Sequence, residues 1–165
     1  MSGERSGLIF NNGMDDFSYP GRTFNYFNLE ETPTNYPEPM KRAISSMAPL
    51  IVLDSKTNEV RMVIGAAGGS KIITAISLAL IRYLWCGQNL KEIIDAPRMH
   101  HQLTPNEIEY EYGVTKSVVD GLSYKNHKLK RFRNRGSIVN ALMISNKNIH
   151  AISDYRKDHS GVNGF

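Results

Sequence analysis

The amino-acid sequence predicts an α+β fold, in which strands and helices occur in separate groups along the chain. The predicted order is strand, loop, hairpin, helices, strand, helix, hairpin. Such grouped order favours α+β over a parallel α/β sheet, in which strands and helices alternate. The 165 residues, of which 41% are hydrophobic, suit one globular domain spanning residues 1–165.

The N-terminal part is predicted to contain a short strand and then a long loop. Residues 7–12 form an apolar run that ends in turn-forming residues, which is typical of a strand. Residues 18–42 contain four prolines, at positions Pro20, Pro33, Pro37 and Pro39. Neither a helix nor a central strand tolerates that density of proline, so a loop is expected. A loop of this length is usually either disordered or functional.

The middle of the chain is predicted to form a hairpin and a helix. Residues 50–54 and 59–64 are apolar runs that flank a polar turn, as in a β-hairpin. The next helix is expected to have Ser70 as its N-cap and to end near Gly87. Its core face is predicted from apolar residues at helical spacing: Ile72, Ile76, Ala79, Leu80, Tyr83 and Leu84. The single cysteine, Cys86, excludes an internal disulfide and is expected to be a small buried side chain.

The remaining elements follow from the same patterns. They are a short helix over 90–95 closed by Pro97, a strand over 107–112, a helix over 116–122, and strands over 138–144 and 149–153. Between them, residues 125–135 hold six Lys and Arg residues and no acid, within a chain of net charge +4. This strip is either a patch for nucleic acid or another anionic surface, or a Lys- and Arg-rich loop or edge strand. We favour the second interpretation and expect no nucleic-acid partner.

A glycine-rich turn over residues 65–70 is the most informative local feature. Glycines let the backbone approach a ligand, and the helix that follows offers free N–H groups and a partial positive charge. Together these suit a phosphate, a carboxylate or a developing oxyanion. The turn does not match the phosphate-loop motif, because Ser70 precedes Lys71, and it does not match the dinucleotide-binding motif G-x-G-x-x-G either. Taken alone, the turn therefore permits an anion site or a structural turn.

Two polar pairs are further candidates. Ser45 and Ser46 precede Met-Ala-Pro, and their hydroxyls suit a carboxylate or a turn. Asp15 and Asp16 suit an ammonium group, a metal or the capping of a turn. The five histidines lack metal-ligand spacing, so no metal or other cofactor is expected. The chain also shows no apolar run long enough to cross a membrane and no signal peptide.

Taken together, five segments resemble the small subunit of the γ-glutamyltransferase (glutathione hydrolase) family, which forms the C-terminal portion of its precursor. In the family's order they are Asn-Asn-Gly-Met-Asp-Asp-Phe-Ser (11–18), Ser-Ser-Met-Ala-Pro (45–49), Val-Arg-Met-Val-Ile-Gly-Ala-Ala-Gly-Gly-Ser (60–70), Ala-Pro-Arg-Met-His-His-Gln-Leu (96–103) and Ser-Asp-Tyr-Arg-Lys (153–157). The resemblance runs from about Ser6 to Phe165. Five motifs in order are far more specific than any one of them.

The resemblance implies an N-terminal-nucleophile hydrolase with an αββα sandwich, here incomplete at its N-terminal strands. Such an enzyme cleaves the γ-glutamyl bond of glutathione through a γ-glutamyl-enzyme intermediate, with water, an amino acid or a dipeptide as acceptor. It needs no cofactor, and its partner is the large subunit of the same precursor. The family works at the extracellular face of the plasma membrane or as a secreted protein.

The resemblance also gives the candidate residues definite roles. Asp16 would bind the donor's α-ammonium group, and Ser45 and Ser46 its α-carboxylate. The backbone N–H groups of Gly68 and Gly69 would form the oxyanion hole. The loop over 19–42 would correspond to a lid.

The family's nucleophile is a threonine at the start of the small subunit, and no residue here matches it. The first threonine is Thr23, in the loop, and Ser2 lies only 14 residues before Asp16. We therefore expect no turnover of γ-glutamyl compounds by the isolated chain, and an exposed sheet edge where the first strands belong. Two interpretations stay open: part of an ordinary γ-glutamyltransferase, or a non-catalytic short paralogue that binds γ-glutamyl ligands or pairs with a full-length relative.

Overall fold

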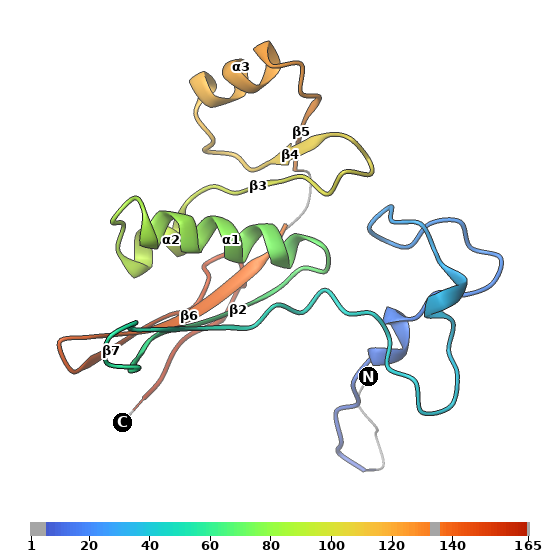
Figure 1. The fold of residues 1–165 in the computed structure, drawn as a ribbon, viewed down its shortest axis with the longest axis horizontal. Coiled ribbons are helices and arrows are strands. Elements are labelled where there is room, and N and C mark those ends of the chain that lie inside the picture. Colours follow the sequence, from blue (N-terminus) through green and yellow to red (C-terminus); the bar gives the residue numbers. More distant parts are fainter. Residues whose placement is uncertain (1–5, 133–135, 165) are drawn as a thin grey trace. The chain divides into compact units, whose positions relative to one another are not determined.

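The computed structural model describes residues 6–132 and 136–164 and divides the chain into two compact units. The boundary lies between Ser45 and Ser46. The single domain expected over residues 1–165 stays a prediction. The α+β class is confirmed, since the four-stranded sheet is antiparallel and most helices and strands occur in separate groups along the chain (Figure 1).

The first unit is mostly irregular. It contains two single turns of 3-10 helix, η1 (Gly13–Asp16) and η2 (Pro33–Asn35), and an isolated bridge between Phe24 and Glu30. The prediction of a loop over 18–42 is thus confirmed. The strand predicted over 7–12 is wrong: neither sheet includes these described residues, and among them only Ile9, which is 87% exposed, takes part in a bridge. An apolar run alone does not make a strand without a neighbouring strand to pair with.

The second unit is built on a four-stranded antiparallel sheet. Its order is β1 (Leu50–Leu53), β2 (Val60–Ala67), β6 (Ile138–Ser145) and β7 (Asn148–Ile152). β1 and β2 form the predicted first hairpin, and β6 and β7 form the last. The two hairpins join at the centre, where β2 pairs with β6.

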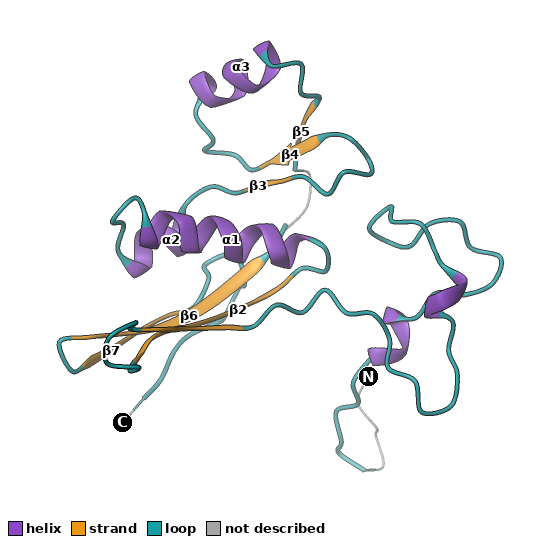
Figure 2. Ribbon diagram, in the orientation of Figure 1, coloured by secondary structure: helices purple, strands orange, loops and turns teal. Residues whose placement is uncertain are grey.

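Two helices cover one face of this sheet (Figure 2). They are α1 (Lys71–Leu84) and α2 (Leu90–Asp95), close to the predicted bounds. The core lies between the helices and the inner face of the sheet and contains Met62, Ile64, Ile72, Ala75, Ile76, Ala79, Leu90, Ile93, Ile94, Val139 and Ala141. The predicted apolar face of α1 is confirmed except at Leu84, which is half exposed at the end of the helix.

The second face of the sheet remains apolar and exposed. Ile51, Val63, Leu142 and Ala151 lie directly opposite one another across the four strands. The exposed fractions of the first three are 61%, 39% and 45%. Because side chains alternate between the two faces of a strand, this row points away from the core.

The chain forms a smaller three-stranded sheet between the two hairpins of the large sheet, in sequence order. It contains β3 (Met99–His100), β4 (Ile108–Tyr110) and β5 (Leu129–Arg131), with α3 (Lys116–Tyr124) between β4 and β5. β4 and α3 were predicted, whereas β3 and β5 are too short to show a period. β5 is an edge strand within the basic strip, as the favoured interpretation of that strip expects. The part of the strip at 133–135 lies outside the described residues.

Cys86 is exposed, so the prediction of a buried thiol is wrong. The helix ends at Leu84, and Cys86 therefore lies beyond the apolar face that the sequence pattern extended to it. Within the described part of the chain, no helix has the length and apolar character required to cross a membrane.

Candidate functional site

The Gly68–Gly69 turn connects the end of β2 to the start of α1. Gly68 has φ +134° and Gly69 has φ +60°, values that L side chains rarely adopt. The backbone N–H of Lys71 donates to the Gly68 oxygen at 3.3 Å, and that of Ile72 to the Gly69 oxygen at 3.0 Å. The turn thus leads straight into the helix, and its own N–H groups lie at the positive end of the helix dipole.

Gly68 also lacks room for a side chain. A Cβ there would lie 2.8 Å from the Gly136 oxygen and 3.0 Å from Cα of Ser137. Both the backbone angle and the packing therefore require glycine at this position. The backbone of residues 136–137, just before β6, forms one wall of the turn.

A chain of polar side chains lies at the start of α1. Ser70 Oγ donates to Gln102 Oε1 at 2.7 Å, and the same oxygen lies 2.9 Å from His100 Nε2. His100 Nδ1 lies 2.8 Å from Thr74 Oγ1, one turn along the helix. Ser70 occupies the predicted N-cap position, but its side chain makes no capping bond. The predicted N-cap position is therefore confirmed, although Gln102 binds the hydroxyl in place of a backbone N–H group of the helix.

His100 is buried, and both of its ring nitrogens have a hydrogen-bond partner. Gln102 Nε2 donates to the Thr104 oxygen at 2.8 Å, which leaves Oε1 as an acceptor for the Nε2–H group of His100. The other ring nitrogen contacts the Thr74 hydroxyl, which itself donates to the Lys71 oxygen at 3.2 Å. Burial lowers the pKa of His100 from its usual 6.5, and Lys71 lowers it further, against the opposing effects of Gln102 and Glu109.

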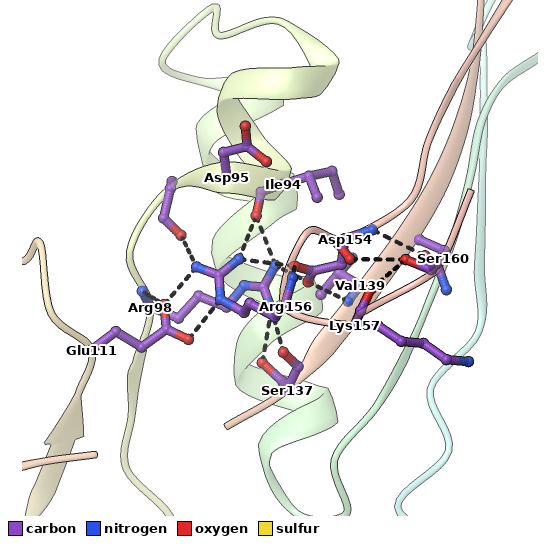
Figure 3. Close-up of polar contacts among 12 residues, drawn as sticks. Ile94, Asp95, Arg98, Glu111, Ser137, Val139, Asp154, Arg156, Lys157 and Ser160 are labelled. Atoms are coloured by element: carbon purple, nitrogen blue, oxygen red, sulfur yellow. Dashed lines mark hydrogen bonds and ion pairs between the residues drawn. The ribbon is translucent and has the colours of Figure 1, made fainter. Parts of the chain in front are cut away.

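A buried charge network lies on the other side of the turn (Figure 3). The guanidinium of Arg98 contacts Asp154 Oδ2 at 2.7 Å and donates to the Ser137 oxygen at 2.8 Å. Arg156 contacts Glu111 at 2.6 Å and Asp154 Oδ1 at 3.1 Å. Burial alone would raise the pKa of Asp154, but hydrogen bonds from two backbone N–H groups and Arg98 hold it below its usual value.

In the first unit, one buried side chain holds a candidate residue and the neighbour of another. Asn35, only 7% exposed, donates through Nδ2 to the Asp16 oxygen at 2.8 Å. Its Oδ1 accepts from the backbone N–H of Ile44 at 2.9 Å, directly before Ser45. The backbones of Asp16 and Ile44 are therefore joined through a single amide group. The carboxylate of Asp16 is exposed, as a ligand-binding group must be.

The candidate residues thus form two groups. Asp16 and Ser45 belong to the first unit, while Gly68 and Gly69 belong to the second, which Ser46 begins. Their convergence on one ligand stays a prediction. The sequence patterns assign no role to Arg98, His100 and Gln102, although the spacing of two residues between them can be read from the sequence. The patterns also give no sign of Asn35, because nothing in the sequence marks one loop asparagine as buried.

Comparison with known proteins identifies the relatives of this arrangement. The family model described as gamma-glutamyltranspeptidase matches residues 1–163. Scoloptoxin SSD20 of Scolopendra dehaani is 40% identical over 168 residues, which cover 99% of this chain and 84% of that protein. Glutathione hydrolase proenzyme 2 of Schizosaccharomyces pombe is 36% identical over 155 residues, which cover 92% of this chain. The match spans only 25% of that proenzyme, as expected for its C-terminal portion.

The fold is similar to that of solved enzymes. Gamma-glutamyltranspeptidase from Pseudomonas nitroreducens, complexed with L-DON, superimposes with a TM-score of 0.84 at 30% sequence identity. The superposition covers 100% of this chain and 86% of the matched chain.

Proposed function

Because the chain belongs to the gamma-glutamyltranspeptidase family, we propose that it provides the donor-binding and oxyanion-binding part of a γ-glutamyltransferase. Its substrates would be glutathione and other γ-glutamyl compounds, with water, amino acids or dipeptides as acceptors. The reaction would pass through a γ-glutamyl-enzyme intermediate, whose nucleophile this sequence does not contribute. The observation that carries the proposal is the Gly68–Gly69 turn at the start of α1.

The geometry of that turn supports an oxyanion hole. Attack on the γ-glutamyl amide places negative charge on its carbonyl oxygen, and preorganised N–H donors stabilise that charge. The N–H groups of Gly68 and Gly69 precede the first helical hydrogen bonds, which use those of Lys71 and Ile72. Loss of one such donor typically lowers the rate by about 10²–10³-fold.

The first unit, together with Ser46 at the start of the second, would supply the donor-binding groups. Asp16 would bind the α-ammonium group, and Ser45 together with Ser46 the α-carboxylate, so that both charges of the γ-glutamyl group are matched. The side chain of Asn35 supports a joint role for Asp16 and Ser45, because one amide group bonds to the backbones of Asp16 and of Ile44, the residue before Ser45. The loop over 19–42 would act as a lid on this site.

The exposed second face of the large sheet supports an incomplete αββα sandwich. Ile51, Val63 and Leu142 form an apolar row of the kind that a second sheet covers. We expect the missing layer to come from the family's preceding strands and its large subunit. An assembled enzyme of this kind would work outside the cell, and the toxin name of the relative SSD20 supports that location.

A second candidate is a short, non-catalytic paralogue. The observation that favours it is the relative SSD20, of which this chain covers 84%. Such a protein would bind γ-glutamyl ligands or pair with a full-length relative without turnover. Both candidates require the same donor-binding residues, and only catalysis separates them.

The donor site is tested by calorimetric titration of the chain with glutathione. Asp16→Asn should weaken binding by about tenfold or more, because a hydrogen bond to a charged group contributes about 1.5–3 kcal/mol. The neighbouring Asp15→Asn serves as the matched control and should leave the dissociation constant unchanged. The double variant Ser45→Ala, Ser46→Ala should weaken glutathione binding but not binding of an analogue without the α-carboxylate.

Equal affinity of the Asp16→Asn variant and the unsubstituted chain would contradict the proposed ammonium site. A larger loss for Asp15→Asn than for Asp16→Asn would move that site to the neighbouring carboxylate.

A further inference from the structure

Three residues of the 96–103 motif have side chains that point the same way. Arg98, His100 and Gln102 occupy alternate positions of the extended segment that contains β3. Alternate residues of an extended chain share one face, and here that face is turned towards the Gly68–Gly69 turn. The residue between His100 and Gln102, His101, bonds instead to Asn106 at the surface.

Two of these side chains hold the helix side of the turn. Gln102 accepts from the hydroxyl of Ser70, which directly follows Gly69, and it also bonds to His100. His100 in turn bonds to Thr74, so Gln102 and His100 both contact the start of α1. His100 is only 5% exposed. Loss of one of these side-chain hydrogen bonds would therefore leave polar atoms without a partner and away from water.

The third side chain holds the opposite wall. Arg98 donates to both the backbone oxygen and the hydroxyl of Ser137, at 2.8 and 3.1 Å. Ser137 is the residue whose Cα leaves no space for a side chain at Gly68. Arg98 is itself fixed by Asp154 and by the Ile94 oxygen, both at hydrogen-bond distance (Figure 3). The Gly68 backbone thus lies against a wall that a buried guanidinium holds in place.

We infer that Arg98, His100 and Gln102 are positioning residues, which fix the peptide N–H groups of Gly68 and Gly69 in the geometry that a developing oxyanion requires. This inference rests on the proposed oxyanion role of the turn. The three residues act through Ser70, Thr74 and Ser137. A preorganised donor stabilises the transition state because it needs no rearrangement when charge develops, and a loosened turn loses that advantage.

The test compares Gln102→Leu with Gln102→Glu. Leucine removes the acceptor for Ser70 and His100, whereas glutamate keeps an acceptor oxygen for both, loses the donor to Thr104 and adds a negative charge beside His100. Gln88→Leu, the same change beyond the far end of α1, is the matched control.

The first readout is amide hydrogen exchange in the full chain. In Gln102→Leu, exchange at Lys71 and Ile72 should accelerate by about tenfold or more, because their N–H groups close the turn. Exchange at Ala79, in the middle of α1, should not change. Gln102→Glu and Gln88→Leu should exchange like the unsubstituted chain at all three amides.

The second readout is catalysis by the chain complemented with a large subunit and the preceding strands of a related glutathione hydrolase. Gln102→Leu should lower kcat by about tenfold with KM for the donor unchanged, because the oxyanion exists only in the transition state. Gln102→Glu should restore kcat.

Unchanged exchange at Lys71 and Ile72, or equal acceleration at Ala79, would overturn the positioning role whatever the enzyme does. Accelerated exchange with an unchanged kcat would instead overturn the oxyanion role of the turn. If the complemented, unsubstituted chain shows no turnover, the proposed function fails, and the exchange data alone decide whether these residues hold the turn.

Discussion

At the scale of single residues, buried polar side chains determine where the exposed functional groups lie. The Asn35 side chain makes three bonds that no apolar residue can replace, to the backbones of Asp16 and Ile44 and to the hydroxyl of Ser18. His100 and Arg98 likewise hold the segments on the two sides of the glycine turn through hydrogen bonds. None of the three is itself a candidate ligand, so their contribution to binding or catalysis is indirect.

Replacement of Asn35 by leucine should weaken glutathione binding by roughly five- to tenfold, because the backbone groups of Asp16 and Ile44 then lose the side chain that holds them in place. Asn35→Asp should lose less, since aspartate still accepts from Ile44 but no longer donates to the Asp16 oxygen. Asn163→Leu, an exposed position in the C-terminal segment, is the control. Calorimetric dissociation constants for the three variants check this order, and equal affinities would show that Asn35 does not hold the site.

His100 should make stability depend on pH near neutrality. Its pKa is lowered in the folded chain and stays near 6.5 in the unfolded chain. As pH falls below 6.5, the unfolded state binds the proton first, so the free energy of unfolding decreases until the folded pKa is reached. Above pH 6.5 this contribution is fully present. Lys71, Glu109 and His101 are the charged or titratable groups that influence the ring.

Urea unfolding at pH 7 and pH 5 measures this effect. The unsubstituted chain should lose more stability between the two pH values than His100→Gln, which has no imidazole to protonate. An identical loss in both proteins would assign the pH dependence to other groups.

At the scale of elements, the long, periodic segments were predictable from sequence and the short ones were not. The hairpins and α1 follow from apolar runs with a clear period, and their bounds agree within a few residues. β3 and β5 are two and three residues long and exist because β4 pairs with both. The strand expected over 7–12 failed for the opposite reason, because its apolar pattern has no partner strand among the described residues.

The candidate site was predictable only in part. Glycines before a helix and paired polar residues indicated ligand chemistry, but several ligands fitted each pattern, and the resemblance alone assigned the roles. The residues around the site lie far away in sequence. Arg98 bonds to Ser137 and Asp154, 39 and 56 positions away, and no local pattern reveals such contacts.

The turn between β2 and α1 should tolerate no side chain at Gly68. Gly68→Ala places a Cβ 2.8 Å from a backbone oxygen at φ +134°, which should lower the free energy of unfolding by about 1–3 kcal/mol. Gly121→Ala, in the exposed helix α3 with nothing within 4 Å, should instead raise it by about 0.5–1 kcal/mol. Thermal unfolding of both variants checks the contrast, and equal stabilities would mean that the turn adapts to a side chain.

At the scale of the whole molecule, the helices of the described residues cover one face of the large sheet and leave the other face without a helical layer. Leu142 lies on the exposed face and its neighbour Ala141 on the buried one, with exposed fractions of 45% and 4%. Leu142→Asp should therefore leave the isolated chain folded and reduce its aggregation, but prevent its assembly with a complementing subunit. Ala141→Asp should unfold the chain, because it buries an unpaired charge.

Light scattering, circular dichroism and co-purification separate these effects. Normal assembly of the Leu142→Asp variant would contradict the proposal that this face is covered in the enzyme.

The central claim is that this chain supplies the donor and oxyanion sites of a γ-glutamyltransferase whose nucleophile comes from elsewhere. The most direct test is turnover of γ-glutamyl-p-nitroanilide by the purified chain, alone and after complementation with a related large subunit and preceding strands. We expect no turnover by the chain alone and recovery of activity on complementation. Turnover by the chain alone would show that another residue makes the attack, with Ser2→Ala as the first variant to examine. Assembly without any turnover would contradict the enzymatic claim and leave the non-catalytic paralogue.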